Sequence, residues 1–422
     1  MSEPITLFRA FRGHRSTVTS VSFSSKGSHL ITGSADKTVM VWSLKPSFRA
    51  FRWTGHKDSV LGVDFHPNGS YAASVGKDAT ARIWRITVSP TPLVISGLTS
   101  PLRSVSWSCH GESLACASDD KCIRVYSVDS LSSSFLHSTK KPTEQSASSA
   151  GVKFSHSFIG HNHWVNCVKF QPGDCCLLAS GGEDGRLCIF DKRIGSKPLF
   201  SKEESGGAIY SLDYSPDGRF IATGSADGKV RVYDVSTTSL IALYEGHSGP
   251  CRSVKFGLGK LKNLIFSGSD DTSCRVWSLS NGCLLYTLWG HNAPVTGVAV
   301  SDCDSTPCRF ATSGGDHVLL WEADAELISE DEHLDGESGH VSGHVEDIDQ
   351  EQQEFEEEPI VDRYTVDRRS VGSVGSGVFT ATLDSLPENV MIALEALSGQ
   401  MDLINHRLDG FDQRLSILES NR

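Results

Sequence analysis

A repeating pattern dominates this chain: Gly-His, then an Asp about 22 residues later, then an aromatic residue six positions further on. Two clear copies are Gly13-His14, Asp36 and Trp42, and Gly55-His56, Asp78 and Trp84. The repeat length is near 42 residues, which is typical of a unit of four short strands. One such unit cannot bury its apolar faces alone, so the pattern predicts an all-β ring of stacked units.

Five looser copies follow, each with the Asp and the aromatic residue. They are Leu98, Asp120 and Tyr126; Gly160-His161, Asp184 and Phe190; Ser205, Asp227 and Tyr233; Gly246-His247, Asp271 and Trp277; and Gly290-His291, Asp316 and Trp321. The pattern is typical of WD40 repeats. Seven copies predict a seven-bladed WD40 β-propeller over residues 1–323, in which the segment 5–11 supplies the outer strand that closes the ring.

The resemblance to WD40 repeats implies a buried hydrogen-bonded chain in each blade. Its members are the His, the Asp, the aromatic residue and a Ser or Thr four residues before the Asp. These residues are His14, Thr32, Asp36, Trp42; His56, Ser74, Asp78, Trp84; His161, Ser180, Asp184; His247, Ser267, Asp271, Trp277; and His291, Thr312, Asp316, Trp321. Unit three has Leu98 and Cys116 in place of the His and the hydroxyl, so Asp120 loses its usual partner and we expect blade three to be less rigid.

Repetition of Ser or Thr, His and Asp in at least five units argues against a catalytic triad, which needs one nucleophile beside one oxyanion hole. The sequence contains no phosphate-binding loop and no His-Glu-x-x-His or Gly-x-Ser-x-Gly motif. We therefore expect a protein that is not an enzyme, with no cofactor, no metal and no small-molecule substrate.

Charge divides the chain into parts. Residues 1–321 hold 33 basic and 26 acidic residues, whereas residues 322–367 hold 18 acidic residues and one Arg, Arg363. Few large apolar side chains follow, so residues 324–384 are predicted to be a disordered linker, first acidic and then Ser/Gly-rich. It acts either as a solvated spacer or as a competitor for the basic propeller. The Ser-rich stretch 129–151 is expected to be a surface loop between blades three and four.

The twelve cysteines are scattered and form no Cys-x-x-Cys pair. With no signal peptide and no apolar run of membrane-spanning length, we expect a cytosolic chain with reduced thiols, no zinc and no membrane partner. The excess positive charge of the propeller is small, and its basic residues are not interleaved with aromatic residues. We therefore expect no nucleic-acid partner.

The second strong pattern is a heptad seam in residues 385–420, which predicts a helical coiled coil. Its apolar residues alternate in spacing between four and three: Val390, Leu394, Leu397, Met401, Ile404, Leu408, Phe411, Leu415 and Leu418. The seam predicts self-association and is compatible with a dimer, a trimer or a tetramer. The alternative is that the helix docks on the propeller.

Three segments together resemble the proteome-of-centriole WD40 protein family. They are Lys45 to Asp58 at the junction of units one and two, His163-Trp164-Val165, and the coil around 397–403 and 413–419. The resemblance implies a structural protein of centrioles and basal bodies, located in the cytoskeleton. It implies a role in microtubule triplet assembly and in ciliogenesis, with tubulin and other centriolar scaffold proteins as partners.

Candidate partner-binding residues are basic or aromatic. Two copies of Phe-Arg-Ala-Phe-Arg fall on expected outer strands, where the arginines either protect strand edges or form a basic ridge against an acidic surface such as tubulin. Trp164 is either an interface anchor or rim packing. The candidates are Arg9, Arg12, Arg49, Arg52, Lys57, Arg103 and Trp164.

Two other functions remain open. Phe190-Asp191-Lys192-Arg193 resembles the adaptor motif of WD40 substrate receptors of cullin-type ubiquitin ligases, with Phe in place of Trp. A propeller followed by a helix also fits a regulatory subunit of a microtubule-associated complex. The centriolar-type coil argues against the ligase receptor, and the sequence shows none of the larger helical domain that such regulatory subunits carry.

Overall fold

The structure is a computed structural model of the 422-residue chain. It describes residues 4–45, 50–87, 91–128, 152–204, 206–302, 308–324 and 328, and the backbone of 145–146 and 366–367. The predicted coiled coil, 385–420, lies outside the described residues, as does most of the linker.

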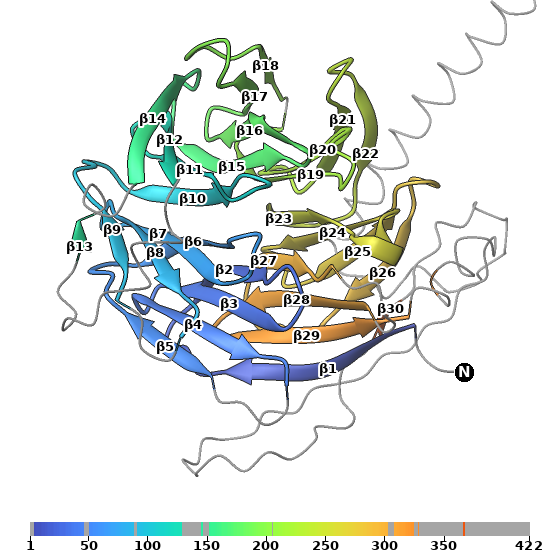
Figure 1. The fold of residues 1–422 in the computed structure, drawn as a ribbon. Coiled ribbons are helices and arrows are strands. Elements are labelled where there is room, and N and C mark those ends of the chain that lie inside the picture. The colour runs from blue at the N-terminus through green and yellow to red at the C-terminus, as the bar shows by residue number, and fades with distance from the viewer. Residues whose placement is uncertain are drawn as a thin grey trace, which may run out of the picture. The chain divides into compact units, whose positions relative to one another are not determined.

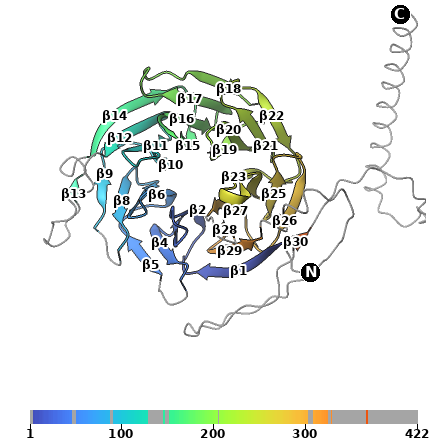
Figure 2. The same ribbon diagram turned by 45° about the vertical axis from the view of Figure 1, so that its right-hand side comes forward.

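The described strands form seven sheets arranged as blades around a ring (Figure 1, Figure 2). The predicted seven-bladed propeller is thereby confirmed. Blade one contains β2 (Val18–Phe23), β3 (His29–Ser34), β4 (Thr38–Ser43) and β5 (Phe51–Thr54). Blade two contains β6 (Val60–Phe65), β7 (Tyr71–Gly76), β8 (Ala81–Arg85) and β9 (Leu93–Ile95). Blade three contains β10 (Leu102–Trp107), β11 (Ser113–Ser118), β12 (Cys122–Val128) and β14 (Val152–Ile159).

The remaining blades repeat this antiparallel order from the inner to the outer strand. Blade four contains β15 (Val165–Gln171), β16 (Asp174–Gly182), β17 (Arg186–Asp191) and β18 (Phe200–Glu203). Blade five contains β19 (Ile209–Tyr214), β20 (Phe220–Ser225), β21 (Val230–Asp234) and β22 (Leu240–Tyr244). Blade six contains β23 (Cys251–Phe256), β24 (Leu264–Ser269), β25 (Cys274–Ser278) and β26 (Leu284–Leu288), with a 3-10 turn at Gly259–Leu261.

The first strand closes the ring. Blade seven contains β27 (Val295–Val300), β28 (Cys308–Gly314) and β29 (His317–Ala323), and its outer strand is β1 (Ile5–Arg12). β1 pairs antiparallel with β29 from Ile5 opposite Ala323 to Arg12 opposite His317. Figure 2 shows β1 beside β29 at this point of the ring. The two ends of the propeller are therefore held together by backbone hydrogen bonds, as the sequence predicts.

The apolar core lies between neighbouring blades. Each cluster joins the inner strand of one blade to the middle strands of the blade before it. Between blades one and two, for example, Ile31 and Val41 pack against Val60 and Phe65. Burial of apolar side chains on both faces of every blade stabilises the ring by removing this surface from water.

Two short strands lie in segments that the sequence predicts to be a surface loop and a linker. In the Ser-rich stretch, β13 (Gln145–Ser146) pairs parallel with β9. In the acidic linker, β30 (Val366–Asp367) pairs antiparallel with β26. Both extend the outer edge of a blade, where backbone groups have no other strand to bond. Composition indicates that such segments lack a core of their own, and it does not exclude pairing with an edge that another segment supplies.

A disulfide between Cys109 and Cys175 corrects the expectation that all thiols are reduced. The two cysteines are 66 residues apart in the sequence, and their Cα atoms lie 5.8 Å apart. Cys109 follows β10 of blade three and Cys175 lies in β16 of blade four. They meet because the turns after the inner strands of adjacent blades converge, which sequence spacing does not indicate.

Candidate protein-interaction site

Three blades contain the complete chain of four side chains. In blade two, the His56 Nδ1 atom lies 3.0 Å from the Asp78 carboxylate, and its Nε2 atom lies 2.7 Å from the Ser74 hydroxyl. The Trp84 indole N–H donates to the same hydroxyl at 2.7 Å. Blades one and six have the same contacts, through His14, Thr32, Asp36 and Trp42, and through His247, Ser267, Asp271 and Trp277. The hydroxyls are fully buried, so these bonds tie the segment before the inner strand to the two middle strands of each blade.

Blade four keeps part of the chain. The His161 ring contacts Asp184 at 3.0 Å and Ser180 at 2.7 Å, while Phe190 takes the aromatic position without a donor. The aromatic ring is fully buried there and contributes packing alone.

Blade seven does not bring Asp316 to His291, and this corrects the proposed membership of Asp316. The His291 Nε2 atom contacts Thr312 at 2.9 Å and Trp321 donates to Thr312 at 2.9 Å. The Asp316 side chain is 66 % exposed and contacts His317 at 3.1 Å. The reason is the turn: β28 pairs with β29 up to Gly314 opposite His317, which leaves only Gly315 and Asp316 between them.

Blades three and five contain substitutes that the repeat pattern does not predict. In blade five, the buried Glu204 carboxylate accepts hydrogen bonds from Thr223 (2.7 Å) and Ser225 (2.8 Å). Arg231 lies 3.6 Å from Glu204 and contacts Asp227 at 2.6 Å. Glu204 therefore replaces the missing His, although it stands one residue before the expected position, Ser205.

In blade three, Asp120 contacts Arg124 at 2.6 Å and accepts the backbone N–H of Cys122 at 3.1 Å. Asp120 has no histidine partner, as expected, and Arg124 on β12 takes the place of that partner. No hydroxyl replaces Cys116, which is fully buried.

The carboxylates that contact a blade histidine are held in their charged form. Burial alone would raise the pKa of Asp36, but donors at Thr38, the Arg15 N–H and His14 outweigh it and lower that pKa to about 2. The pKa values of Asp78 and Asp271 are also lowered, by their histidines and neighbouring N–H groups against the effect of burial. These carboxylates accept structural hydrogen bonds and are not placed for proton transfer.

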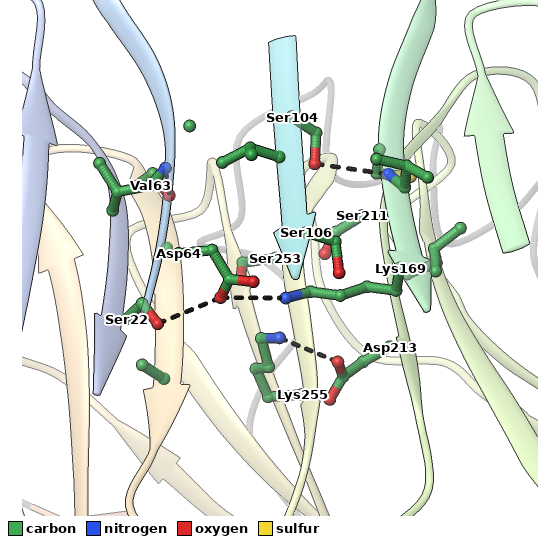
Figure 3. Close-up of a pocket in the computed structure, with 18 of the residues that line it drawn as sticks. Ser22, Val63, Asp64, Ser104, Ser106, Lys169, Ser211, Asp213, Ser253 and Lys255 are labelled. Carbon is green, nitrogen blue, oxygen red and sulfur yellow. Dashed lines mark hydrogen bonds and ion pairs between the residues drawn. The ribbon is translucent and has the colours of Figure 1, made fainter. Parts of the chain in front are cut away.

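The inner strands enclose a channel of about 490 Å³. Hydroxyls of inner strands accept backbone N–H groups from the next blade, as Ser211 does from Val254 at 3.1 Å and Ser253 from Val298 at 2.9 Å. Lys169 reaches across from blade four to Asp64 of blade two at 3.5 Å, and Lys255 contacts Asp213 at 2.9 Å (Figure 3). These two lysines and two aspartates line the channel and are paired with one another. The channel is therefore a structural feature of the ring.

One mouth of the channel presents arginine and aromatic side chains. Arg103 pairs with Asp119, and its guanidinium carbon lies 4.4 Å from the centre of the Trp164 ring. Arg252 forms three hydrogen bonds with Asp270, and its guanidinium carbon lies 4.3 Å from the centre of the Tyr210 ring. We call these four residues, Arg103, Trp164, Tyr210 and Arg252, the arginine–aromatic rim.

The rim lies where the inner strands begin. Arg103, Tyr210 and Arg252 each stand second in their inner strand, and all three line the channel. Asn166, second in β15, donates to Glu183 at 2.9 Å. Trp164 immediately precedes β15 and its side chain is 40 % exposed. The rim therefore combines partly exposed rings with arginines whose direction is fixed by carboxylates.

Of the residues predicted to bind a partner, the structure brings Arg103 and Trp164 together. Lys57 is exposed in blade two, where its backbone N–H donates to Asp78 at 2.8 Å. Arg9 lies over the Phe11 ring on β1, Arg12 is exposed on the same strand, and Arg52 on β5 donates to the Gly13 carbonyl. Arg49 lies outside the described residues, as do the proposed oligomerisation residues, Val390 to Leu418.

Sequence reasoning missed Tyr210 and Arg252. An available signal was their position: both follow the first apolar residue of an inner strand, as Arg103 does. Their stacking could not be found in this way, because the contact crosses from blade five to blade six.

Comparison with known proteins settles the repeat family. The family model for the WD domain, G-beta repeat, matches residues 5–43, 49–85 and 92–127. These residues are WD40 repeats. A second family model, the N-terminal domain of nucleolar protein 10-like proteins, matches residues 149–305 of this chain. Neither model describes a catalytic family, and neither is specific to centrioles.

Individual relatives are similar over parts of the propeller. The chain is 32 % identical to WD repeat-containing protein 1 of Xenopus tropicalis over 94 residues, which are 22 % of this chain and 15 % of the relative. It is 23 % identical to THO complex subunit 3 of Arabidopsis thaliana over 269 residues, 59 % of this chain and 72 % of the relative. The chain thus spans about 15 % of the length of the first of these relatives. WD40 propellers mediate contacts between proteins.

Among the residues that the structure describes, no helix has both the length and the apolar character needed to cross a membrane.

Proposed function

We propose that the protein is a non-enzymatic structural scaffold of centrioles and basal bodies, which supports microtubule triplet assembly and stability and so ciliogenesis. The arginine–aromatic rim is the observation that carries the binding part of this proposal. The resemblance of residues 45–58, 163–165, 397–403 and 413–419 to the proteome-of-centriole WD40 family supports the cellular place.

The composition of the rim suits a protein interface. Trp, Tyr and Arg are the residues that contribute most binding energy at such interfaces. Trp164 offers an exposed ring that Arg103 holds in one orientation, so less side-chain entropy is lost on binding. Arg103 and Arg252 already bind the carboxylates of Asp119 and Asp270, and can exchange them for carboxylates of an acidic partner such as tubulin.

The proposed coil increases the strength of such contacts. A single propeller with a rim of a few exposed side chains binds weakly, whereas linked copies bind through effective concentration. Self-association through the heptad residues Val390 to Leu418 would therefore let several linked propellers bind at once to an assembly that contains many copies of the partner.

Localisation in a cell with centrioles tests the proposal. We expect the tagged full-length chain to form spots that coincide with centriolar tubulin. We expect Trp164→Ala to weaken these spots, and Trp289→Ala to leave them unchanged. Trp289 is a matched control because its side chain is also 40 % exposed and it lies outside the rim.

A diffuse or nuclear signal of the full-length chain would overturn the centriolar proposal. Equal loss of spots in both tryptophan variants would leave the scaffold in place and remove the rim from it. Truncation after Asp324 separates the contribution of the coil, since the described propeller strands end at Ala323.

A second candidate is a substrate receptor of a cullin-type ubiquitin ligase. The observation in its favour is the surface position of Arg193 in the Phe190 to Arg193 motif, with a side chain 56 % exposed. Its guanidinium forms three hydrogen bonds to Asp191, at 2.7 to 3.0 Å. Co-purification of a ligase adaptor with the full-length chain, lost in Arg193→Ala, would put this function first.

A further inference from the structure

Two turns at the other mouth of the channel bring together three metal-binding side chains. Cys109 and His110 lie in the turn between β10 and β11, and Cys175 lies near the start of β16. Their ligand atoms, two sulfur atoms and one imidazole nitrogen, all lie within 4.8 Å of one another. Within the described residues, no other group of His, Cys, Asp and Glu meets this distance.

The three side chains are accessible from solvent. His110 is exposed and both cysteines are partly exposed, so reagents and ions can reach the sulfur atoms. Most other described cysteines are buried, and burial raises the pKa of thiols such as Cys116 and Cys251 to about 12. The adjacent Cys176 projects to the opposite side of β16, because side chains alternate along a strand.

We propose that Cys109, His110 and Cys175 form a binding site for a thiophilic divalent cation, with Zn²⁺ as the expected ion, when the disulfide is reduced. Two thiolates and one imidazole are a preferred donor set of Zn²⁺. Zn–S bonds of about 2.3 Å and Zn–N bonds of about 2.0 Å place tetrahedral donors somewhat under 4 Å apart. Reduction lets the two bonded sulfur atoms separate toward that spacing, and all three donor atoms already lie within 4.8 Å of one another.

The disulfide is reduced before the metal binds. A phosphine reductant and one water molecule convert the disulfide to two thiols, and the phosphine becomes its oxide. Binding of Zn²⁺ then releases the two thiol protons, because the thiolate is the ligand. The three protein ligands leave the fourth tetrahedral position for water or for a ligand from a partner.

The site would join blade three to blade four. Blade three lacks the His and the hydroxyl of blades one, two and six, and Leu98 and Cys116 stand in their places. Either the disulfide or the metal fastens the turn of this blade to its neighbour. This inference does not depend on the centriolar proposal, because it concerns a bond within the propeller.

Cobalt binding tests the site. Full-length protein is reduced with a phosphine, desalted without oxygen and titrated with Co²⁺. We expect about one equivalent to give a thiolate-to-cobalt charge-transfer band and tetrahedral d–d bands, which one equivalent of Zn²⁺ removes. Cys109→Ser and Cys175→Ser should each abolish the charge-transfer band, and His110→Ala should weaken cobalt binding by about tenfold or more.

Matched controls exclude a general loss of fold. Cys122→Ser removes a partly exposed thiol of the same blade and His163→Ala an exposed imidazole of blade four, and both should bind Co²⁺ like the wild type. Zn²⁺ should also raise the melting temperature of the reduced wild type and not that of Cys109→Ser. Absence of a cobalt–thiolate band in the reduced wild type, or its persistence in both cysteine variants, would overturn the proposal and leave a disulfide alone.

Discussion

Asp271 and Asp316 occupy the same position of their repeats, and only Asp271 contacts the histidine of its own Gly-His pair. Asp271 accepts hydrogen bonds from His247 at 2.8 Å and from the N–H of Ser248 at 3.1 Å. We expect Asp271→Ala to lower the free energy of unfolding by about 1–3 kcal/mol, because buried donors lose their acceptor. Asp316→Ala should change it by less than about 0.5 kcal/mol, as for other exposed positions. Urea unfolding of both variants measures the difference, and equal losses would contradict the geometry.

The stabilisation of the fold by a single residue, Asp36, should depend on pH. The folded pKa of Asp36 is about 2, below its usual value of 3.8. The unfolded state therefore binds the proton more readily, and the stabilisation by Asp36 is complete above the unfolded pKa. It should be lost as the pH falls from about 4 toward about 2. The difference in unfolding free energy between wild type and Asp36→Asn, followed from about pH 5 to about pH 2, should shrink. A constant difference would contradict the lowered pKa.

At the scale of the element, blade five has exchanged its histidine for a buried carboxylate. Glu204 is 5 % exposed and contacts Thr223, Ser225 and Arg231, whereas the side chain of its neighbour Glu203 is 71 % exposed. Glu204→Ala should destabilise the propeller by about 2–4 kcal/mol, since Arg231 and two hydroxyls lose a buried partner. Glu203→Ala is the matched control and should cost about 0–1 kcal/mol. Chemical denaturation compares them, and a mild effect of Glu204→Ala would mean that Asp227 alone satisfies Arg231.

At the scale of the whole molecule, stability depends on closure of the ring by β1. Phe11 is buried among residues of blades seven and one, and Arg12 beside it is exposed. Phe11→Ala should lower the unfolding free energy by about 3–5 kcal/mol through lost burial and a cavity. Arg12→Ala keeps the strand and should change it by less than about 0.5 kcal/mol. Thermal unfolding distinguishes the two, and equal melting temperatures would show that the ring holds without this strand.

Self-association also belongs to the whole molecule, and it rests on the heptad pattern alone. Light scattering should give an oligomer for the full-length chain and a monomer for a truncation after Asp324. Ile404→Asp places a charge in the predicted seam and should shift the full-length chain toward monomer. A monomeric wild type at micromolar concentration would contradict the predicted coil.

The number of blades, their order and the closing strand follow from the sequence by itself. The repeat places His, Ser or Thr, Asp and Trp at fixed intervals, and short antiparallel strands convert fixed intervals into fixed contacts, as in His56, Ser74 and Trp84. The sequence also predicts two of the four residues of the arginine–aromatic rim, Arg103 and Trp164, as partner-binding residues, because of their position within the repeat.

Only the tertiary structure decided the contacts that depart from this spacing. Asp316 turns outward because its hairpin is one residue shorter, and Glu204 fills a position assigned to Ser205. The stacking of Arg252 on Tyr210 and the pairing of Cys109 with Cys175 join different blades. Spacing within a repeat determines which residues meet inside one blade, whereas the curvature of the closed ring determines which residues of neighbouring blades meet.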